Sequence, residues 1–309
     1  MQILTCCFYW YNFSTFSAFR PKAPRPALVT GMKLLSRLRD PRYFQVAVLA
    51  SLLAVGVGLL DFGIRWQNAL TIMLTAQLVQ YIGTQLAGFP RFDPLSALIT
   101  SLSLTLLLRT EFAGLAATAA VIAIGSKFLI RFRNKHIFNP ANVALVSLML
   151  LSDRAWVSSG QWGSAAIGAF ALACLGFLVL TRAKRAETTI AFLCIYGSLL
   201  FGRALWLGDP LSIPLHQLQN GALLIFAFFM ISDPKTTPDA PIGRMLFALF
   251  IAATTFIIQF IFYQPNGPIL ALILCAPLVP VIDTVLHGSH YRWDKPGTQP
   301  SPTFKGVHS

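Results

Sequence analysis

The chain has 309 residues, of which 55% are hydrophobic and only 11% are charged. A soluble domain of this size would leave much of that apolar surface in water, so the composition excludes an ordinary soluble protein and indicates an integral membrane protein. The formal net charge is +13. Because the basic residues lie in short segments beside apolar runs, as topology determinants do, we expect the lipid bilayer as a partner and no nucleic acid.

The first residues differ from the rest of the chain. We expect residues 1–42 to form a disordered, basic cytoplasmic tail, because a basic and proline-rich linker, Arg20 to Pro26, lies within it. The charged n-region that a signal peptide needs before its apolar core is missing. Residues 1–31 are also a candidate for a misassigned start, with Met32 as the initiator.

Ten apolar runs follow and predict an all-α integral membrane protein with one polytopic membrane domain over residues 43–286. The runs are residues 43–60, 69–88, 93–108, 112–130, 139–152, 163–181, 189–206, 218–232, 244–263 and 268–286. The run 139–152 would extend only about 21 Å, against a hydrocarbon core of about 30 Å. Short spans opened by Pro or Asn are typical of broken or re-entrant helices around a central site.

Basic residues alternate between the two sides of these spans. Loops on one side carry clusters such as Arg131 to Lys135, whereas loops on the other side carry single arginines with an acidic neighbour, or no basic residue. The positive-inside rule then predicts that both termini are cytoplasmic, including a polar C-terminal tail over residues 287–309. We expect a multi-pass protein of the inner (plasma) membrane.

The two halves of the chain resemble each other at the starts of their short spans. Phe92-Asp93-Pro94 parallels Phe138-Asn139-Pro140, and the halves 43–152 and 163–286 contain five predicted spans each. An odd number of spans per half forces the halves into opposite orientations, which is the plan of an inverted repeat. In that plan the fifth span faces the tenth, which begins at Asn266-Gly267-Pro268.

The residues with the clearest chemical potential lie at three predicted helix ends on the cytoplasmic side. Asp93-Pro94 and Asn139-Pro140 open helices, because Asp and Asn are good N-caps and Pro suits the first helical position, and Ser232 to Pro238 closes one. Helix N-termini with nearby cations can hold a phosphate, a carboxylate or the phosphate arm of a flavin. The alternative is that these residues only cap helices at the membrane edge, with the cations facing lipid headgroups. The candidate binding residues are Asp93, Ser96, Asn139, Asn142, Asp233, Lys235, Thr236 and Thr237.

Other polar residues receive structural interpretations. Lys127 lies in an apolar run one turn before Arg131, so we expect its ammonium group to snorkel to the membrane surface. Asp283 ends the last span, and its carboxylate can contact the same cytoplasmic cluster. His287 and His290 have no carboxylate or cysteine companion, so no metal site is predicted. We find no serine or cysteine triad, HExxH motif, Walker loop or GxGxxG motif, and predict no catalytic residue.

Three blocks together resemble the membrane subunits of flavin-linked electron-transport complexes, namely RnfD of the Rnf complex and the corresponding membrane subunit of the sodium-pumping NADH:quinone oxidoreductase. The blocks are Ser96 to Thr100, Phe138 to Ala141, and Ser232 to Pro238 with Gly243-Arg244 and a span pair ending at Asp283. Their order and spacing match over residues 43–286. The resemblance implies a urea-channel-like, five-plus-five inverted repeat that holds flavin near the membrane surface.

One departure limits this resemblance. Those subunits attach FMN through the threonine of a Ser-Gly-Ala-Thr motif in a long segment after the Asn-Pro helix, whereas here that segment is only Ser152 to Gly163 and Ser159-Gly160 is not followed by Ala-Thr. We therefore expect no covalent FMN, while a non-covalent flavin or a quinone stays open. The compact form is more similar to the stand-alone, UnbU-type membrane proteins associated with enediyne biosynthesis, on Gly160 to Gly163, Gly208 to Pro210 and His216 to Gln219.

Three functions stay open from the sequence. The first is a membrane redox component without covalent FMN that passes electrons between other membrane or redox proteins. The second is a solute or ion channel or transporter of urea-channel-like fold with no redox role. The third is a membrane anchor for a biosynthetic partner. We favour the first, in which the protein is a non-catalytic electron-transport or transport component rather than an enzyme.

Overall fold

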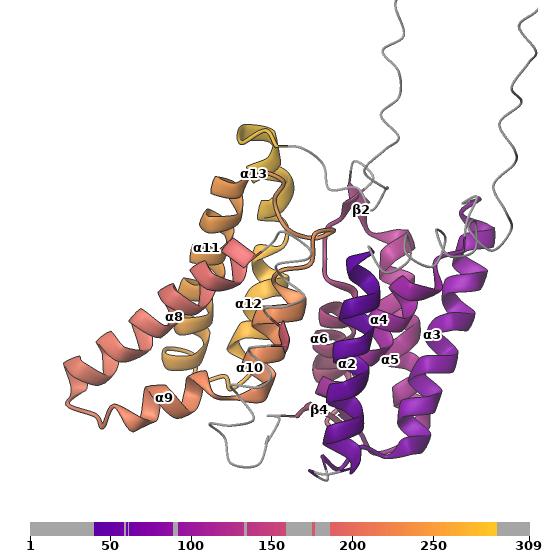
Figure 1. Ribbon diagram of the computed structural model, residues 1–309, viewed down its shortest axis with the longest axis horizontal. Coiled ribbons are helices and arrows are strands. Elements are labelled where there is room, and N and C mark those ends of the chain that lie inside the picture. Colours follow the sequence, from indigo (N-terminus) through magenta and orange to yellow (C-terminus); the bar gives the residue numbers. More distant parts are fainter. Residues whose placement is uncertain are drawn as a thin grey trace, which may run out of the picture. The chain divides into compact units, whose positions relative to one another are not determined.

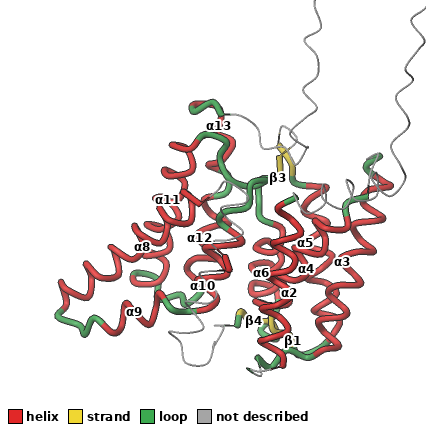
Figure 2. Tube along the Cα trace, in the orientation of Figure 1, coloured by secondary structure: helices red, strands yellow, loops and turns green. Residues whose placement is uncertain are grey.

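The computed structural model describes the chain in seven stretches, separated by short gaps and one long gap. The stretches are residues 40–58, 60, 62–88, 92–132, 135–158, 175–176 and 186–288. Nearly all of the predicted tails and of the predicted span 163–181 lie outside these residues. In the described part the chain is mostly helical, as predicted, and its few strands form two short two-stranded ribbons (Figures 1 and 2).

The first half contains five helices, which fall on the first five predicted runs. They are α2 (Pro41–Gly58), α3 (Trp66–Leu86), α4 (Pro94–Leu107), α5 (Ala113–Leu129) and α6 (Pro140–Leu151). After α4, strand β1 (Leu108–Thr110) pairs antiparallel with β4 (Ala155–Val157), which follows α6. Between α5 and α6, β2 (Arg131–Phe132) pairs with β3 (Lys135–His136). The two ribbons therefore lie beyond opposite ends of α6.

The predicted starts of α4 and α6 are confirmed by their capping contacts. The Asp93 Oδ1 atom accepts a hydrogen bond from the backbone N–H of Ser96 (3.3 Å), and Asn139 Oδ1 accepts one from the N–H of Asn142 (3.2 Å). A proline occupies the first helical turn in both cases. Each start is thus encoded within four consecutive residues.

The second half contains both long helices and broken ones. Its elements are α8 (Ala186–Leu207), α9 (Ser212–Leu218), α10 (Gly221–Ile225), the π-helix η1 (Phe226–Met230), α11 (Pro241–Phe260), α12 (Gly267–Cys275) and α13 (Leu278–Val285). The predicted run 268–286 is not one straight helix, because α12 and α13 meet at a bend of 51°. Pro277 lies at that break and cannot donate a backbone hydrogen bond to continue α12. The α9 helix and the α10–η1 pair meet at a similar bend of 50°.

Side chains from elsewhere in the fold satisfy backbone carbonyls of η1. Thr189 Oγ1 donates to the carbonyl of Ala227 (2.5 Å), and Ser232 Oγ donates to that of Phe228 (2.6 Å). Asn139 Nδ2 is 3.4 Å from the carbonyl oxygen of Met230. A π-helix widens the turn and is frequently found at functional sites. These contacts hold the wide turn beside the start of α6.

Helix packing follows the same plan in both halves. Helix α3 packs on α5 and α5 packs on α6, while α8 packs on α11 and α11 packs on α12. A Cβ atom at Gly83 of α3 would lie 2.5 Å from the Phe128 ring of α5, so this close approach requires glycine. The halves meet where α6 packs on α12, and Asn142 Nδ2 donates to the carbonyl of Ile269 (3.0 Å).

Several helices are apolar enough to lie in a membrane. Among the described residues, α8 and α11 are long and apolar enough to span one singly, and the bent pairs α9 with α10–η1 and α12 with α13 would add two further spans. The helices α2, α4, α5 and α6 are apolar but shorter. This pattern is compatible with the predicted all-α membrane fold.

Candidate functional site

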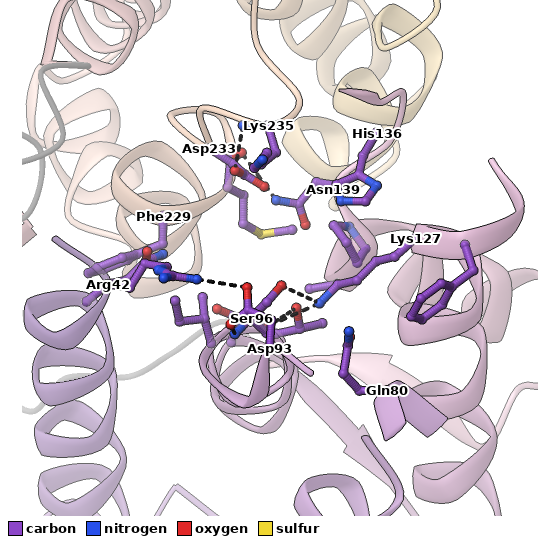
Figure 3. A pocket seen from close by; sticks show the side chains of 18 of the residues that line it. Arg42, Gln80, Asp93, Ser96, Lys127, His136, Asn139, Phe229, Asp233 and Lys235 are labelled. Atoms are coloured by element: carbon purple, nitrogen blue, oxygen red, sulfur yellow. Dashed lines mark hydrogen bonds and ion pairs between the residues drawn. The ribbon is translucent and has the colours of Figure 1, made fainter. Parts of the chain in front are cut away.

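A cavity of about 340 Å³ lies where the starts of α4 and α6 approach the end of η1 (Figure 3). Helices α2, α3 and α5 also contribute to its wall. We name it the basic cavity because four of its lining side chains are arginine or lysine. It is lined by Arg42, Gln45, Gln80, Thr84, Asp93, Ser96, Ile99, Thr100, Ser103, Lys127, Phe128, Arg131, His136, Asn139, Pro140, Ala141, Phe229, Met230, Asp233 and Lys235.

The structure brings five of the eight predicted binding residues together in this cavity. These are Asp93, Ser96, Asn139, Asp233 and Lys235. They come from the starts of two helices and from the turn that follows η1, so residues that are far apart in sequence meet at one place. The pairing of the three predicted helix ends is therefore present in the structure.

The other three predicted residues lie outside the cavity lining. Asn142 is 1% exposed and its amide bonds to the carbonyl of Ile269 in α12. Thr236 and Thr237 are buried, and Thr237 Oγ1 donates to the carbonyl of Asp233 (2.9 Å). The threonines belong to the turn that places Asp233 and Lys235, and Asn142 joins the two halves of the fold.

Arg42 contributes a cation that the sequence pattern indicates only as a topology determinant. Its Nη1 atom lies 2.8 Å from Asp93 Oδ2, and its Nη2 atom lies 2.8 Å from Asp40 Oδ2. One guanidinium therefore joins the start of α2 to the cap of α4. Figure 3 shows Arg42 and Lys127 reaching the cavity from opposite sides, with Asp93 and Ser96 between them.

The prediction that Lys127 snorkels to the membrane surface is wrong. Its side chain is 5% exposed, and the ammonium group donates to the carbonyl (3.0 Å) and the hydroxyl (3.1 Å) of Ser96. The side chain crosses to the first turn of α4 because α4 and α5 pack together. Within the described part of the chain, Lys127 forms no ion pair.

Gln80 is a second lining residue that the sequence interpretation missed. It lies in the middle of α3, is only 7% exposed, and its Oε1 atom has no hydrogen-bond partner among the described residues. Figure 3 shows its amide directed into the cavity, below Ser96 and Lys127. A buried amide without a partner is unfavourable, and so points to a ligand group. The detectable signal was a glutamine inside an apolar run.

His136 is buried beside the cations of the cavity. Burial, together with the positive charges of Lys127, Arg131 and Lys235, lowers the pKa of His136 to about 3. Its Nδ1 atom is buried and has no hydrogen-bond partner in the described part of the chain. The imidazole is therefore neutral at physiological pH and adds no charge to the site.

Lys235 is affected in the same direction. Burial lowers the pKa of its ammonium group, and nearby Arg131 and Arg42 act in the same direction, while Asp233 opposes them. The Asp233 carboxylate instead accepts a hydrogen bond from the backbone N–H of Lys235 (3.0 Å). No ion pair of Lys235 occurs among the described residues.

A smaller cavity of about 140 Å³ lies on the other side of His136. Here Lys135 Nζ is 3.1 Å from Asp239 Oδ1 and 2.9 Å from Asp283 Oδ2, and the backbone N–H of Asp239 donates to Asp283 Oδ1 (2.8 Å). We name these three side chains the carboxylate cluster. It confirms that Asp283 contacts the basic segment Arg131 to Lys135, and it ties α13 and the turn after η1 to β3.

A third cavity, of about 510 Å³, lies beyond the other end of α6, and we name it the opposite cavity. It is lined by Trp156, Val157, Ser158, Tyr196, Gln217, Asn220, Ala222, Leu223, Phe226, Gln259, Pro265, Asn266, Pro268 and Ile269. These described residues carry amides and aromatic rings but no charge. The π-helix η1 contributes to both cavities, through Phe226 on one side and Phe229 with Met230 on the other.

Comparison with known proteins gives a family match over part of the chain. The model of the NQR2, RnfD, RnfE family matches residues 157–292. This segment supplies Phe229, Met230, Asp233 and Lys235 to the basic cavity. The predicted resemblance is thus confirmed in the second half, whereas its predicted extension to residue 43 lies outside the matched residues.

Individual relatives show the same resemblance. A protein of Erwinia tasmaniensis is 34% identical over 110 residues, which are 35% of this chain and 30% of the relative. Relatives from Mannheimia succiniciproducens (35% identical, 27% and 24% covered) and Haemophilus influenzae (30% identical, 35% and 30% covered) are similar. All three are named as the D subunit of an ion-translocating oxidoreductase complex. The chain matches less than a third of the length of each.

Proposed function

We propose that this protein is a membrane component of an electron-transport assembly and holds a non-covalent flavin or quinone in the basic cavity. The observation that carries the proposal is that the segment matched by the NQR2, RnfD, RnfE family supplies one wall of this cavity. The relatives are named as subunits of an ion-translocating oxidoreductase complex, so we expect other membrane or redox proteins as partners. The protein would act as a component of such an assembly and not as an enzyme alone.

The dimensions and chemistry of the cavity support a small cofactor. Ligand cavities usually measure about 300–1,000 Å³ and combine apolar walls with a few polar groups. The basic cavity, at about 340 Å³, has Phe128, Phe229 and Met230 on its walls beside the polar groups of Ser96 and Lys127. A planar, electron-poor ring with carbonyl acceptors suits these donors. We expect it to be held without a covalent bond, because the loop that would carry the attachment threonine is short.

We further propose ten spans in a urea-channel-like, five-plus-five inverted repeat over residues 43–286, with both termini cytoplasmic. The mirrored packing of α3, α5 and α6 in one half and α8, α11 and α12 in the other supports this plan. The contact between α6 and α12 supports the predicted facing of the fifth and tenth spans. In this arrangement the basic cavity opens to the cytoplasm and the opposite cavity to the other side. The tails 1–42 and 287–309 would then lie in the cytoplasm.

The ultraviolet–visible spectrum of the detergent-purified protein tests the cofactor. We expect flavin absorbance that is lost on acid precipitation, or a quinone in the organic extract, and we expect Lys127→Met to lose most of it. Arg154→Met is the matched control, because Arg154 is an exposed cation far from the cavity, with 65% of its side chain accessible. Protein that contains neither cofactor and takes up neither on incubation would contradict the proposal.

A second candidate function is a channel for small polar solutes or ions. It is favoured by one observation, namely that the basic cavity and the opposite cavity lie beyond opposite ends of α6 and both reach η1. Proteoliposomes separate the two functions. Flux of small solutes through protein that carries no cofactor would favour the channel, and its absence would remove it.

A further inference from the structure

The ion pairs around the basic cavity divide its cations into two groups. Arg42 is neutralised by the carboxylates of Asp40 and Asp93, each 2.8 Å away. Lys127 and Lys235 form no ion pair with any described residue, although both line the cavity. A buried charge without a partner is costly, so two unpaired ammonium groups facing one cavity favour a ligand with two negative charges.

The helix starts themselves do not provide the main donors. The first-turn N–H groups of Ser96 and Asn142 already donate to the caps Asp93 and Asn139. The prolines that follow these caps have no N–H to offer. Ligand binding therefore has to come from side chains that cross the cavity.

Gln80 provides independent support for a ligand in this place. Its side chain is more than nine-tenths buried, its Oε1 atom has no partner among the described residues, and its amide is directed into the cavity (Figure 3). An amide donates to a phosphate oxygen and also accepts from the P–O–H of a protonated phosphate. Together with the third N–H of the Lys127 ammonium, it offers both kinds of contact to a phosphoryl group.

We propose that the basic cavity binds a phosphate monoester, with Lys127 and Lys235 neutralising its charge and Gln80 bonding to its oxygens. This inference rests on the proposed function in that it names the chemical class of the ligand at the same site. A phosphate monoester carries about −1.5 to −2 charges at pH 7, which matches two unpaired ammonium groups. A carboxylate would leave one of them unpaired, and a quinone would leave both.

Three sources offer this chemistry, and a binding experiment separates them. The full-length protein in neutral detergent is titrated with inorganic phosphate, flavin mononucleotide and riboflavin, and phosphatidic acid in the micelles serves as a competitor. We expect flavin mononucleotide to bind at least about tenfold more tightly than riboflavin, and inorganic phosphate to compete with it. If phosphatidic acid competes and neither flavin binds, the monoester is a lipid headgroup.

Variants assign the binding to the cavity. We expect Lys127→Met and Lys235→Met each to weaken phosphate binding about tenfold or more, and Gln80→Leu to weaken it less while preserving net charge. Arg154→Met is the matched control that should bind as the unmodified protein does. The thermal midpoint of each variant is measured alongside, and Gln80→Leu keeps the test valid if a lysine variant does not fold.

The outcomes also separate this inference from the proposed function. Equal affinity for riboflavin and flavin mononucleotide, without competition by phosphate, would overturn the phosphate monoester and leave a flavin component intact. Phosphate binding that depends on Lys127 and Lys235, without affinity for any flavin or quinone, would support the inference and overturn the redox cofactor.

Discussion

Among the individual residues, His136 is the group whose burial has the clearest measurable consequence. Its pKa of about 3 in the folded protein lies below the ordinary value of 6.5, so the unfolded chain takes up the proton first as pH falls. Stability conferred by the neutral imidazole is complete above about pH 6.5 and is lost progressively as pH falls toward 3. We therefore expect the thermal midpoint of His136→Gln to fall less between pH 7 and pH 5 than that of the unmodified protein. The matched control is His216→Gln, because His216 is an exposed imidazole on α9. A slope for His136→Gln equal to that of the control would contradict the burial of a neutral imidazole.

Among the secondary-structure elements, η1 depends on hydrogen bonds from other helices. Thr189→Val keeps the shape of the side chain but removes the donor to the carbonyl of Ala227. Hydrogen bonds between membrane helices contribute about 0.6–1.7 kcal/mol, so we expect a loss of stability of about 1 kcal/mol, measured as a lower midpoint in detergent. Thr118→Val is the control, because Thr118 bonds only to Gly114 of its own helix. A loss no greater than that of Thr118→Val would mean that Thr189 does not support the π-helix.

Across the fold as a whole, the carboxylate cluster joins β3 of the first half to the turn after η1 and to α13. Lys135→Met would leave Asp239 and Asp283 side by side, with 3% and 17% of their side chains exposed. Removing one partner from a buried ion pair costs about 3–5 kcal/mol, so we expect a loss near 3 kcal/mol in a denaturation experiment.

Two comparisons make that expectation specific. Adding Asp283→Asn to Lys135→Met should restore part of the stability, because one of the two unpaired charges is removed and the asparagine oxygen still accepts from the Asp239 N–H. Arg154→Met breaks an exposed ion pair with Glu111 and should change stability by less than about 1 kcal/mol. Equal losses for Lys135→Met and Arg154→Met would show that the cluster does not hold the halves together.

The proposed orientation in the membrane is also a property of the whole fold. In a background without the native cysteines, Phe132→Cys in β2 and Arg154→Cys before β4 place exposed thiols beyond opposite ends of α6. We expect a membrane-impermeant maleimide to label Arg154→Cys from outside the cell and to label Phe132→Cys only after lysis. The reverse pattern would invert the topology, and labelling of both from outside would remove the span between them.

Local chemistry explains why part of the fold was predictable. The starts of α4 and α6 depend on an N-cap and a proline within four residues, so a short stretch of sequence predicts them to the residue. The bend between α12 and α13 was missed because an apolar run does not reveal whether Pro277 kinks a helix or ends it. The mistake at Lys127 has a similar cause, since an apolar run with one cation is compatible with a lysine at the surface or with one that crosses to a neighbouring helix.

Composition, apolar periodicity and capping residues are enough to establish that the chain is an apolar helical protein and where most of its helices begin. They also place polar groups at helix ends, at Asp93, Asn139 and the turn at Asp233. Which cations share one cavity depends on helix packing, because Arg42, Gln80, Lys127 and Lys235 lie on four different segments and no short-range pattern specifies which helix faces meet. The same packing removes Asn142, Thr236 and Thr237 from the cavity lining, since their side chains are used within the fold.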